Sequence, residues 1–131
     1  MTINGEVQLN ETDPHPSLQC TLRRTRASGL HVRVAPHLDA TTFGPTIEAL
    51  ACQLVLVPRY VVLEPGPLWD RSESEMIAIS RMVALIHRAE IALRVVLPES
   101  ESSDQVLAIG VTPADGLFRS LESAERGRAD N

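Results

Sequence analysis

The residues that could most readily do chemistry lie in one short segment, Leu68-Trp-Asp-Arg-Ser-Glu-Ser-Glu-Met76. This segment places hydroxyl and carboxylate side chains where a predicted buried strand passes into a predicted amphipathic helix. Free backbone N–H groups at the start of a helix attract phosphate and other anions. The chemistry to consider is therefore phosphorylation of Ser72 or Ser74, or anion recognition, at the start of a helix.

Catalysis and metal binding find little support elsewhere in the chain. No nucleophile in a strained turn accompanies the neighbouring His37 and Asp39, although nucleophilic catalysis needs one beside a base. Gly66 stands alone between two prolines rather than in a glycine-rich phosphate loop. All twelve basic residues are arginine, which excludes lysine chemistry. The histidines lack the spacing of a metal site: they are His15, His31, His37 and His87.

We therefore expect no catalysis, no metal and no cofactor. A pocket that held perturbed acids near Asp39 and Glu64 would favour an enzyme instead.

Composition predicts one compact, acidic domain. The chain has 131 residues, of which 44% are hydrophobic, and this suffices for a single core. The formal net charge of -5 argues against a nucleic-acid groove or an anionic membrane surface, since either would need clustered basic residues. No apolar run approaches the about 20 residues that span a bilayer, and no signal peptide is evident. We expect a cytoplasmic protein.

The domain is expected to span residues 18–126. Residues 1–17 are polar and contain two prolines close together, which indicates a flexible tail, and residues 127–131 form a short C-terminal tail. Cys20 and Cys52 fall in predicted core elements without metal or redox spacing. Both are expected to be buried free thiols.

The first half of the domain predicts a β-hairpin followed by a helix. Apolar and polar residues alternate over 18–22 and over 30–34, and Arg26-Ala-Ser-Gly29 supplies the turn between them. Asp39, with a threonine two or three residues later, can then cap a helix that Pro58 ends. The apolar residues of this helix recur at helical spacing: Ile47, Leu50, Ala51 and Leu54.

The second half predicts strands that alternate with helices. Residues 60–63 form a short apolar run, as expected of a central strand buried on both faces. Ser72 and Glu75 form an S-x-x-E capping box, which starts a helix running to about Ala89. Further elements follow: a strand at 91–97, a helix at 102–110 capped by Ser102 with Gln105, a short strand at 117–121 and a helix at 122–126.

Alternation of strand and helix requires crossover connections, which favour parallel pairing. The sequence therefore predicts an α/β fold with a mixed, mostly parallel sheet of four to five strands. An antiparallel hairpin opens this sheet, and about four helices accompany it.

In order and spacing, several of these segments resemble the STAS domain, a family that includes the anti-sigma factor antagonists of bacterial partner-switching systems. The resemblance spans about Leu18 to Arg126 and implies a STAS-like fold. The residues that carry it are Leu38–Thr41, Val61–Glu64, Asp70–Met76, Ala92–Val96 with Pro98, Val106–Val111, and Phe118.

In that family a kinase phosphorylates a serine at the start of the second long helix, within an Asp-Ser-Ser-Gly-Leu motif, and the added charge ejects a bound partner. Counted without gaps from Glu64, the acceptor position falls at Glu73 and the second serine at Ser74. A two-residue gap after Glu64 instead places Arg71 at the acceptor and Ser72 at the second serine. We favour the ungapped correspondence because it keeps the apolar face of the helix in the family's register. Glu73 carries one negative charge against about 1.5 to 2 for phosphoserine, so it could mimic the modified state only in part.

Three interpretations of this segment stay open. Ser72 and the neighbouring acids can serve only to cap the helix and to balance its dipole. Alternatively, Ser74 or Ser72 is a phosphoacceptor, or the surface binds a partner without phosphorylation. Trp69 falls at an apolar position of the family, where a core residue is expected more often than an interface anchor. The candidate partner-binding residues are Asp39, Thr41, Trp69, Asp70, Ser72, Glu73, Ser74 and Glu75.

The resemblance implies a non-catalytic regulatory module that binds an anti-sigma factor of the histidine-kinase-like serine kinase type, as a monomer or in a hetero-complex. The alternative is a STAS accessory subunit of a lipid-transporting ABC system, which would bind the transporter's ATPase without a phosphoserine. Neither interpretation involves nucleic acid or direct membrane insertion.

Overall fold

The computed structural model describes residues 18–97 and 103–127. The predicted tail at 1–17, the residues after 127 and the predicted capping residue Ser102 lie outside these ranges. The strands are β1 (Cys20–Arg24), β2 (Leu30–Val34), β3 (Tyr60–Glu64), β4 (Ala92–Val96) and β5 (Gly116–Phe118). The helices are α1 (Gly44–Leu54), α2 (Glu73–Arg88), α3 (Ser103–Ala108) and α4 (Leu121–Arg126), and three 3₁₀ turns are η1 (Arg26–Ser28), η2 (Ala40–Thr42) and η3 (Leu68–Asp70).

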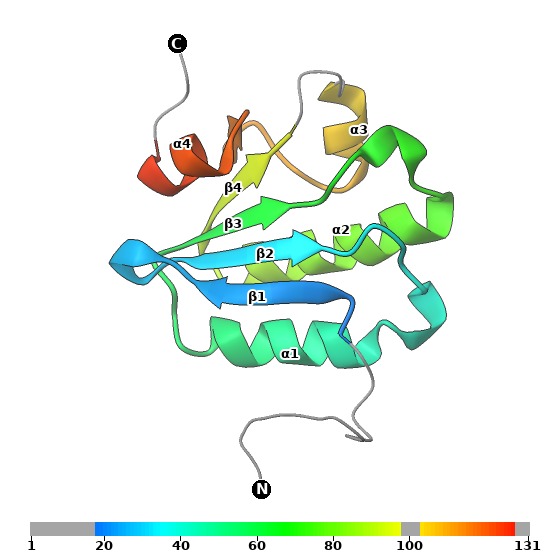
Figure 1. Ribbon diagram of the computed structural model, residues 1–131, viewed down its shortest axis with the longest axis horizontal. Helices are drawn as coiled ribbons and strands as arrows, with labels where there is room; N and C mark the ends of the chain where they lie inside the picture. Colours follow the sequence, from blue (N-terminus) through cyan, green and yellow to red (C-terminus); the bar gives the residue numbers. More distant parts are fainter. Residues whose placement is uncertain (1–17, 98–102, 128–131) are drawn as a thin grey trace, which may run out of the picture.

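The strands form one sheet in the order β1-β2-β3-β4-β5 (Figure 1). β1 and β2 pair antiparallel, and each later pair is parallel. Parallel neighbours need a crossover connection, which α1, α2 and α3 supply in turn. The predicted α/β fold, with a mixed and mostly parallel sheet opened by a hairpin, is confirmed. The apolar run at 60–63 forms the central strand, as predicted.

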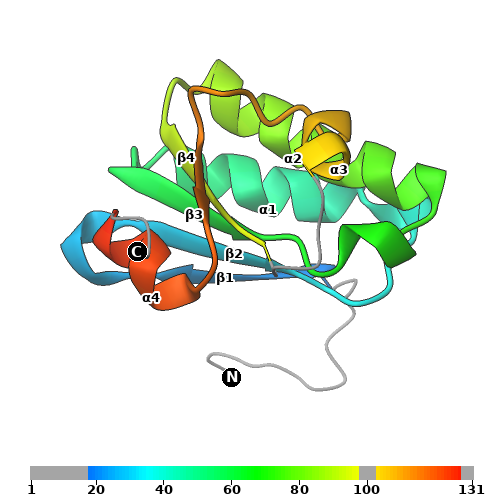
Figure 2. The same ribbon diagram turned by 90° about the horizontal axis from the view of Figure 1, so that it is seen from above.

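Helices α1 and α2 cover one face of the sheet, and α4 lies against the other (Figure 2). The alternating sequence of β2 sends Leu30, Val32 and Val34 into the core under α1 and α2, so His31 and Arg33 face the opposite side. A smaller apolar cluster on the α4 side consists of Tyr60, Val62, Val96, Phe118 and Ala124. Among the described helices, none is both long and apolar enough to cross a bilayer.

The two ends of α1 differ from the prediction. The Asp39 carboxylate caps the turn η2, whereas α1 begins only at Gly44 and has no side-chain cap. α1 ends at Leu54 rather than at Pro58, because the chain turns through Val57. The Val57 N–H bonds back to the Leu54 carbonyl, and its φ of 52° lies in the left-handed region. A residue that precedes proline avoids the right-handed helical conformation, so the helix cannot continue to the proline.

Two further expectations are corrected, one on burial and one on the start of the last helix. Cys20 is a buried free thiol as predicted, but Cys52 is exposed because it lies on the outer side of α1. Leu121 begins α4 instead of ending the last strand, since the Ser120 hydroxyl accepts a hydrogen bond from the Ser123 N–H and caps the helix there.

Gly29 offers a direct test of this packing. A Cβ at Gly29 would overlap the Tyr60 ring and the Thr25 hydroxyl, whereas a Cβ at Gly44 would meet nothing. We expect Gly29→Ala to lower the free energy of unfolding by about 1–3 kcal/mol, the usual cost of overpacking. Gly44→Ala is the matched control and should leave it equal or slightly higher. Urea unfolding measures both values, and equal stability of the two variants would contradict the packing of Tyr60 against Gly29.

Candidate functional site

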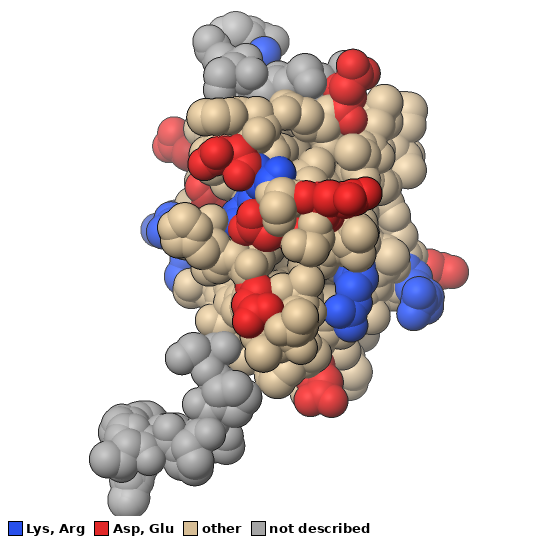
Figure 3. Space-filling model, turned by 90° about the vertical axis from the view of Figure 1, so that its right-hand side faces the viewer, with Lys and Arg blue, Asp and Glu red and all other residues tan. Residues whose placement is uncertain are grey.

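The predicted site residues lie at one end of the sheet. β2 and β3 run parallel, so the loops that follow them, at residues 35–43 and 65–72, emerge at the same edge. α2 begins at that edge as well. Figure 3 views this end of the molecule and shows acidic side chains near its centre, with basic side chains beside them. The exposed acids among the candidates are Asp39, Asp70 and Glu73.

The capping box at the start of α2 is formed as predicted. The Ser72 hydroxyl accepts a hydrogen bond from the Glu75 N–H at 3.2 Å. In return, Glu75 Oε1 accepts one from the Ser72 N–H at 3.0 Å. Two backbone donors that the helix itself cannot satisfy are thereby paired, which fixes the point where the helix begins.

The second oxygen of Glu75 joins this helix start to two other segments. Glu75 Oε2 accepts a hydrogen bond from the Leu38 N–H at 3.0 Å and from Arg71 Nη1 at 3.2 Å. The Arg71 side chain is only 3% exposed, and it also donates to the carbonyls of Pro36, at 3.1 Å, and Pro65, at 2.6 Å. The loops after β2 and β3 are therefore held against α2 by one ion pair and its hydrogen bonds.

These contacts act on the ionisation of Glu75. The backbone N–H groups of Ser72 and Leu38, followed by the Arg71 guanidinium, stabilise its charged form. They lower the pKa of Glu75 from 4.5 to about 2, although partial burial opposes the shift. Glu75 is therefore ionised in the folded protein at any physiological pH.

The Asp39 loop is ordered by its own hydrogen bonds. Asp39 Oδ1 accepts from the Thr41 hydroxyl at 2.6 Å and from the Thr41 N–H at 3.0 Å, and these bonds lower the pKa of Asp39. The Gln19 side chain bridges the loop by accepting from the Asp39 N–H and donating to the carbonyls of Asp39 and Thr42. Asp39 and Thr41 are thus brought to the same end of the domain as α2, held there by Leu38 and Glu75.

The expectation that Trp69 lies in the core is wrong. Leu68 takes the buried position, with 2% exposure, and the turn η3 directs the next residue outward. Trp69 is 64% exposed, next to the exposed Asp70. A large exposed aromatic side chain is typical of a contact surface rather than of a hydrophobic core.

The two candidate serines differ in the hydrogen bonds of their hydroxyl groups. The Ser72 hydroxyl serves the cap, whereas the exposed Ser74 hydroxyl has one hydrogen-bond partner among the described residues, the Ser72 hydroxyl at 3.2 Å. Ser74 is therefore the more available hydroxyl. Glu73 is exposed beside it, while both carboxylate oxygens of Glu75 are taken by internal donors.

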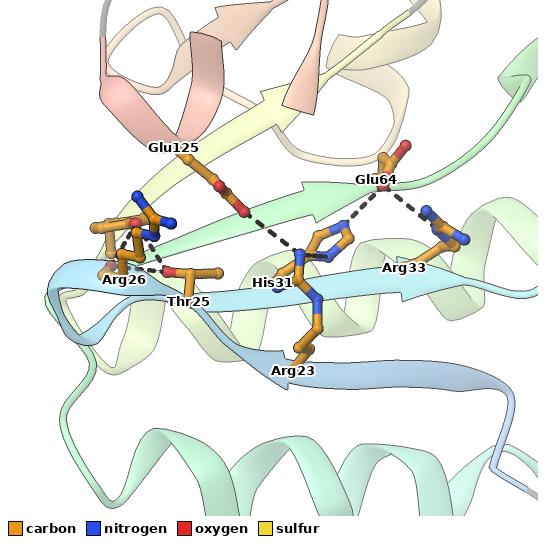
Figure 4. A network of polar contacts seen from close by, with 8 residues as sticks. Arg23, Thr25, Arg26, His31, Arg33, Glu64 and Glu125 are labelled. Carbon is orange, nitrogen blue, oxygen red and sulfur yellow. Dashed lines mark hydrogen bonds and ion pairs between the residues drawn. The ribbon is translucent and has the colours of Figure 1, made fainter. Parts of the chain in front are cut away.

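A polar network on the α4 side of the sheet was not anticipated from the sequence (Figure 4). His31, whose side chain is 5% exposed, lies with Nε2 2.7 Å from Glu64 Oε1 and with Nδ1 3.2 Å from Arg23 Nη2. A guanidinium can only donate, so Nδ1 is the acceptor and Nε2 carries the proton shared with Glu64. Arg33 approaches the same Glu64 oxygen at 3.5 Å, and Arg23 approaches Glu125 at 3.4 Å. The alternation of β2, which places His31 and Arg33 on one face, was the available signal.

The geometry also bears on metal binding and on catalysis by paired acids. Among the described residues, no three His, Cys, Asp or Glu side chains gather in a way that could hold a metal ion. A cavity at the ends of the strands includes Glu64, but Asp39 is not among its described lining residues. The two acids considered for an enzyme are therefore not brought together there.

Comparison with known proteins gives no further assignment. No protein-family model matches the chain, and no curated protein matches it in sequence.

The role of Glu75 leads to a pH-dependent prediction. Because its pKa is lower in the folded than in the unfolded chain, its stabilisation is complete above about pH 4.5 and is lost as the pH falls towards 2. We expect Glu75→Gln to lower the free energy of unfolding at pH 7 by about 1–3 kcal/mol. Urea unfolding at pH 7 and pH 3 should show a smaller loss between the two pH values in this variant than in wild type.

Glu73→Gln is the matched control, because Glu73 is exposed two residues before Glu75 in the same helical turn and forms no hydrogen bond with a described residue. It should keep the stability of wild type and its pH dependence. If Glu75→Gln lost as much stability between pH 7 and pH 3 as wild type does, the ionised role of Glu75 would be contradicted.

Proposed function

We propose that this protein is a non-catalytic regulatory protein-interaction module that acts in the manner of an anti-sigma factor antagonist. Its partner is an anti-sigma factor of the histidine-kinase-like serine kinase type. The observation that carries the proposal is the exposed Trp69, set beside Asp70 and Glu73 on the end of the domain that Glu75 holds in place.

The physical support lies in the rigidity of this surface. Binding costs free energy when loops must be ordered, and a preorganised surface avoids part of that cost. The ion pair between Arg71 and Glu75 is largely removed from solvent, and it fixes the segments that present Asp39 and Trp69. Tryptophan is enriched among the residues that dominate binding energy at interfaces. The neighbouring acids fit a partner with a basic surface, since complementary charge speeds and orients association.

Burial also supports the ungapped correspondence with the family motif. Glu73 and Ser74, which it places at the two serine positions, are exposed at the first turn of α2. The gapped version would place the acceptor at Arg71, whose side chain is 3% exposed. A carboxylate at the acceptor position gives a weaker charge than phosphoserine. On this basis Ser74 is the residue at which phosphorylation would act, and Glu73 already supplies one negative charge beside it.

Partner capture tests the proposal at Trp69. Tagged full-length protein is used to capture binding proteins from the source cells, followed by quantitative mass spectrometry. Trp69→Ala should reduce recovery of the kinase-type partner by about tenfold or more, since truncated tryptophan anchors cost that much. Val55→Ala is the control, because Val55 is 77% exposed and directly follows the C-terminal end of α1, whereas the loop that contains Asp39 precedes the N-terminal end of α1.

Both variants should unfold within about 0.5 kcal/mol of wild type, as expected of exposed positions. Equal recovery of the partner by Trp69→Ala and wild type would contradict the proposed surface. Recovery of a transporter ATPase in place of a histidine-kinase-like protein would favour the transporter subunit.

Phosphorylation provides a separate test at Ser74. Incubation with the captured kinase and ATP should add one phosphate to wild type and to Ser72→Ala, and none to Ser74→Ala, as read from intact mass. Ser72→Ala removes a helix cap worth about 1 kcal/mol, so its folding is checked first. An unmodified wild-type mass under saturating kinase would contradict phosphorylation and leave partner binding as the function of this surface.

A further inference from the structure

A cavity of about 370 Å³ opens at the ends of β2, β3 and β4. Among the residues that the structure describes, its wall contains three arginines, Arg33, Arg71 and Arg119, and one acid, Glu64. The lining residues Val34, Glu64 and Val96 stand at the carboxyl ends of these three parallel strands. The volume is that of a small-molecule site, for which about 300–1,000 Å³ is usual.

We propose that this cavity binds a small organic anion, a carboxylate or phosphate carried on an apolar body. The proposal does not depend on the protein partner, although Arg71 belongs both to the cavity wall and to the contacts that hold the end of the domain containing Trp69. Its first support is charge. Of the three guanidinium groups at the cavity, Arg71 is paired with Glu75 and Arg33 with Glu64, so the uncompensated positive charge is that of Arg119. Arg119 is exposed and forms no ion pair with any residue that the structure describes.

The second support is a buried donor that lacks an acceptor. The Arg71 side chain is 3% exposed, and its Nη atoms donate to Glu75, Pro36 and Pro65. Its Nε–H is buried without a hydrogen-bond partner among the described residues. Leaving such a group unpaired is costly, and buried guanidinium donors are normally all satisfied. Because Nε is buried, an anionic oxygen in the cavity would supply this acceptor after a shift of the Arg71 side chain, which lines the cavity.

The third support is the chemistry of the remaining wall. Val34, Pro36, Pro67 and Val96 line the cavity and present apolar surface beside the arginines. Inorganic anions gain nothing from such a surface, whereas the hydrocarbon part of an organic anion does. The combination of guanidinium groups with apolar walls therefore selects a ligand that has both parts.

Arg71 also connects this cavity with the end of the domain that contains Trp69. The same guanidinium lines the cavity and holds Glu75, which in turn holds the Leu38 N–H. An anion that accepts a hydrogen bond from Arg71 would change the strength of the ion pair between Arg71 and Glu75. Ligand binding would then alter how firmly the loop before Asp39 is held.

Isothermal calorimetry on the purified full chain tests the proposal with four probes: phenyl phosphate, benzoate, inorganic phosphate and uncharged benzyl alcohol. Phenyl phosphate or benzoate should bind, and inorganic phosphate and benzyl alcohol should each bind more weakly. Arg119→Ala and Arg33→Ala should each weaken binding of the organic anion by about tenfold, since each removes a charge-assisted contact. Arg81→Ala, which removes an exposed arginine on α2, should bind as wild type does.

Arg119→Ala and Arg33→Ala act at exposed positions, so the test does not depend on a variant that fails to fold. Absence of binding by both organic anions would overturn the proposal. Equal loss of affinity in Arg81→Ala would overturn it too, because the effect would then reflect net charge alone. Affinity for inorganic phosphate as high as that for phenyl phosphate would overturn the assignment of an organic ligand.

Discussion

The carboxylate of Glu75 accepts hydrogen bonds from two backbone N–H groups, of Ser72 and Leu38, that lie far apart in the sequence. One oxygen completes the cap of α2, and the other holds the loop after β2 together with the buried Arg71. Such a buried ion pair stabilises a fold only when its remaining donors and acceptors are satisfied, and most of them here are. The end of the domain that carries the candidate residues therefore depends on one acid, and its low pKa follows from the same contacts.

The topology of the sheet makes this convergence possible. β2 and β3 are parallel neighbours, so their following loops leave the sheet at one edge, where α2 also begins. The short turn η3 buries Leu68 and exposes Trp69, so the indole side chain of Trp69 lies on the surface of the domain. On the opposite face, the β2 alternation places His31 and Arg33 against Glu64, beside the cavity. A rigid scaffold thus presents an aromatic and acidic surface on one side and an arginine-rich pocket next to it.

Local signals allowed much of this to be predicted. The S-x-x-E pattern of Ser72 and Glu75 lies within four residues. The alternation of apolar residues in β2 identifies a strand and its core face, and the continuous apolar run of β3 identifies a strand buried on both faces. The bond between Glu75 and Leu38 could not be predicted, because it joins residues 37 positions apart and requires the loops to meet in three dimensions. The stretch around Asp39 offered several capping residues, and which helix Asp39 capped depended on where the chain could turn. The exposure of Trp69 and of Cys52 was likewise settled by which neighbour took the core position.

The most direct test is a pH titration followed by nuclear magnetic resonance, with the Glu75 side-chain carboxyl carbon and the backbone amides of Leu38 and Ser72 observed together. If Glu75 holds these segments, its carboxyl should titrate near pH 2, and both amides should shift with the same midpoint. A Glu75 carboxyl that titrates near its ordinary value of 4.5, while the Leu38 amide does not respond, would contradict the central role given to this residue.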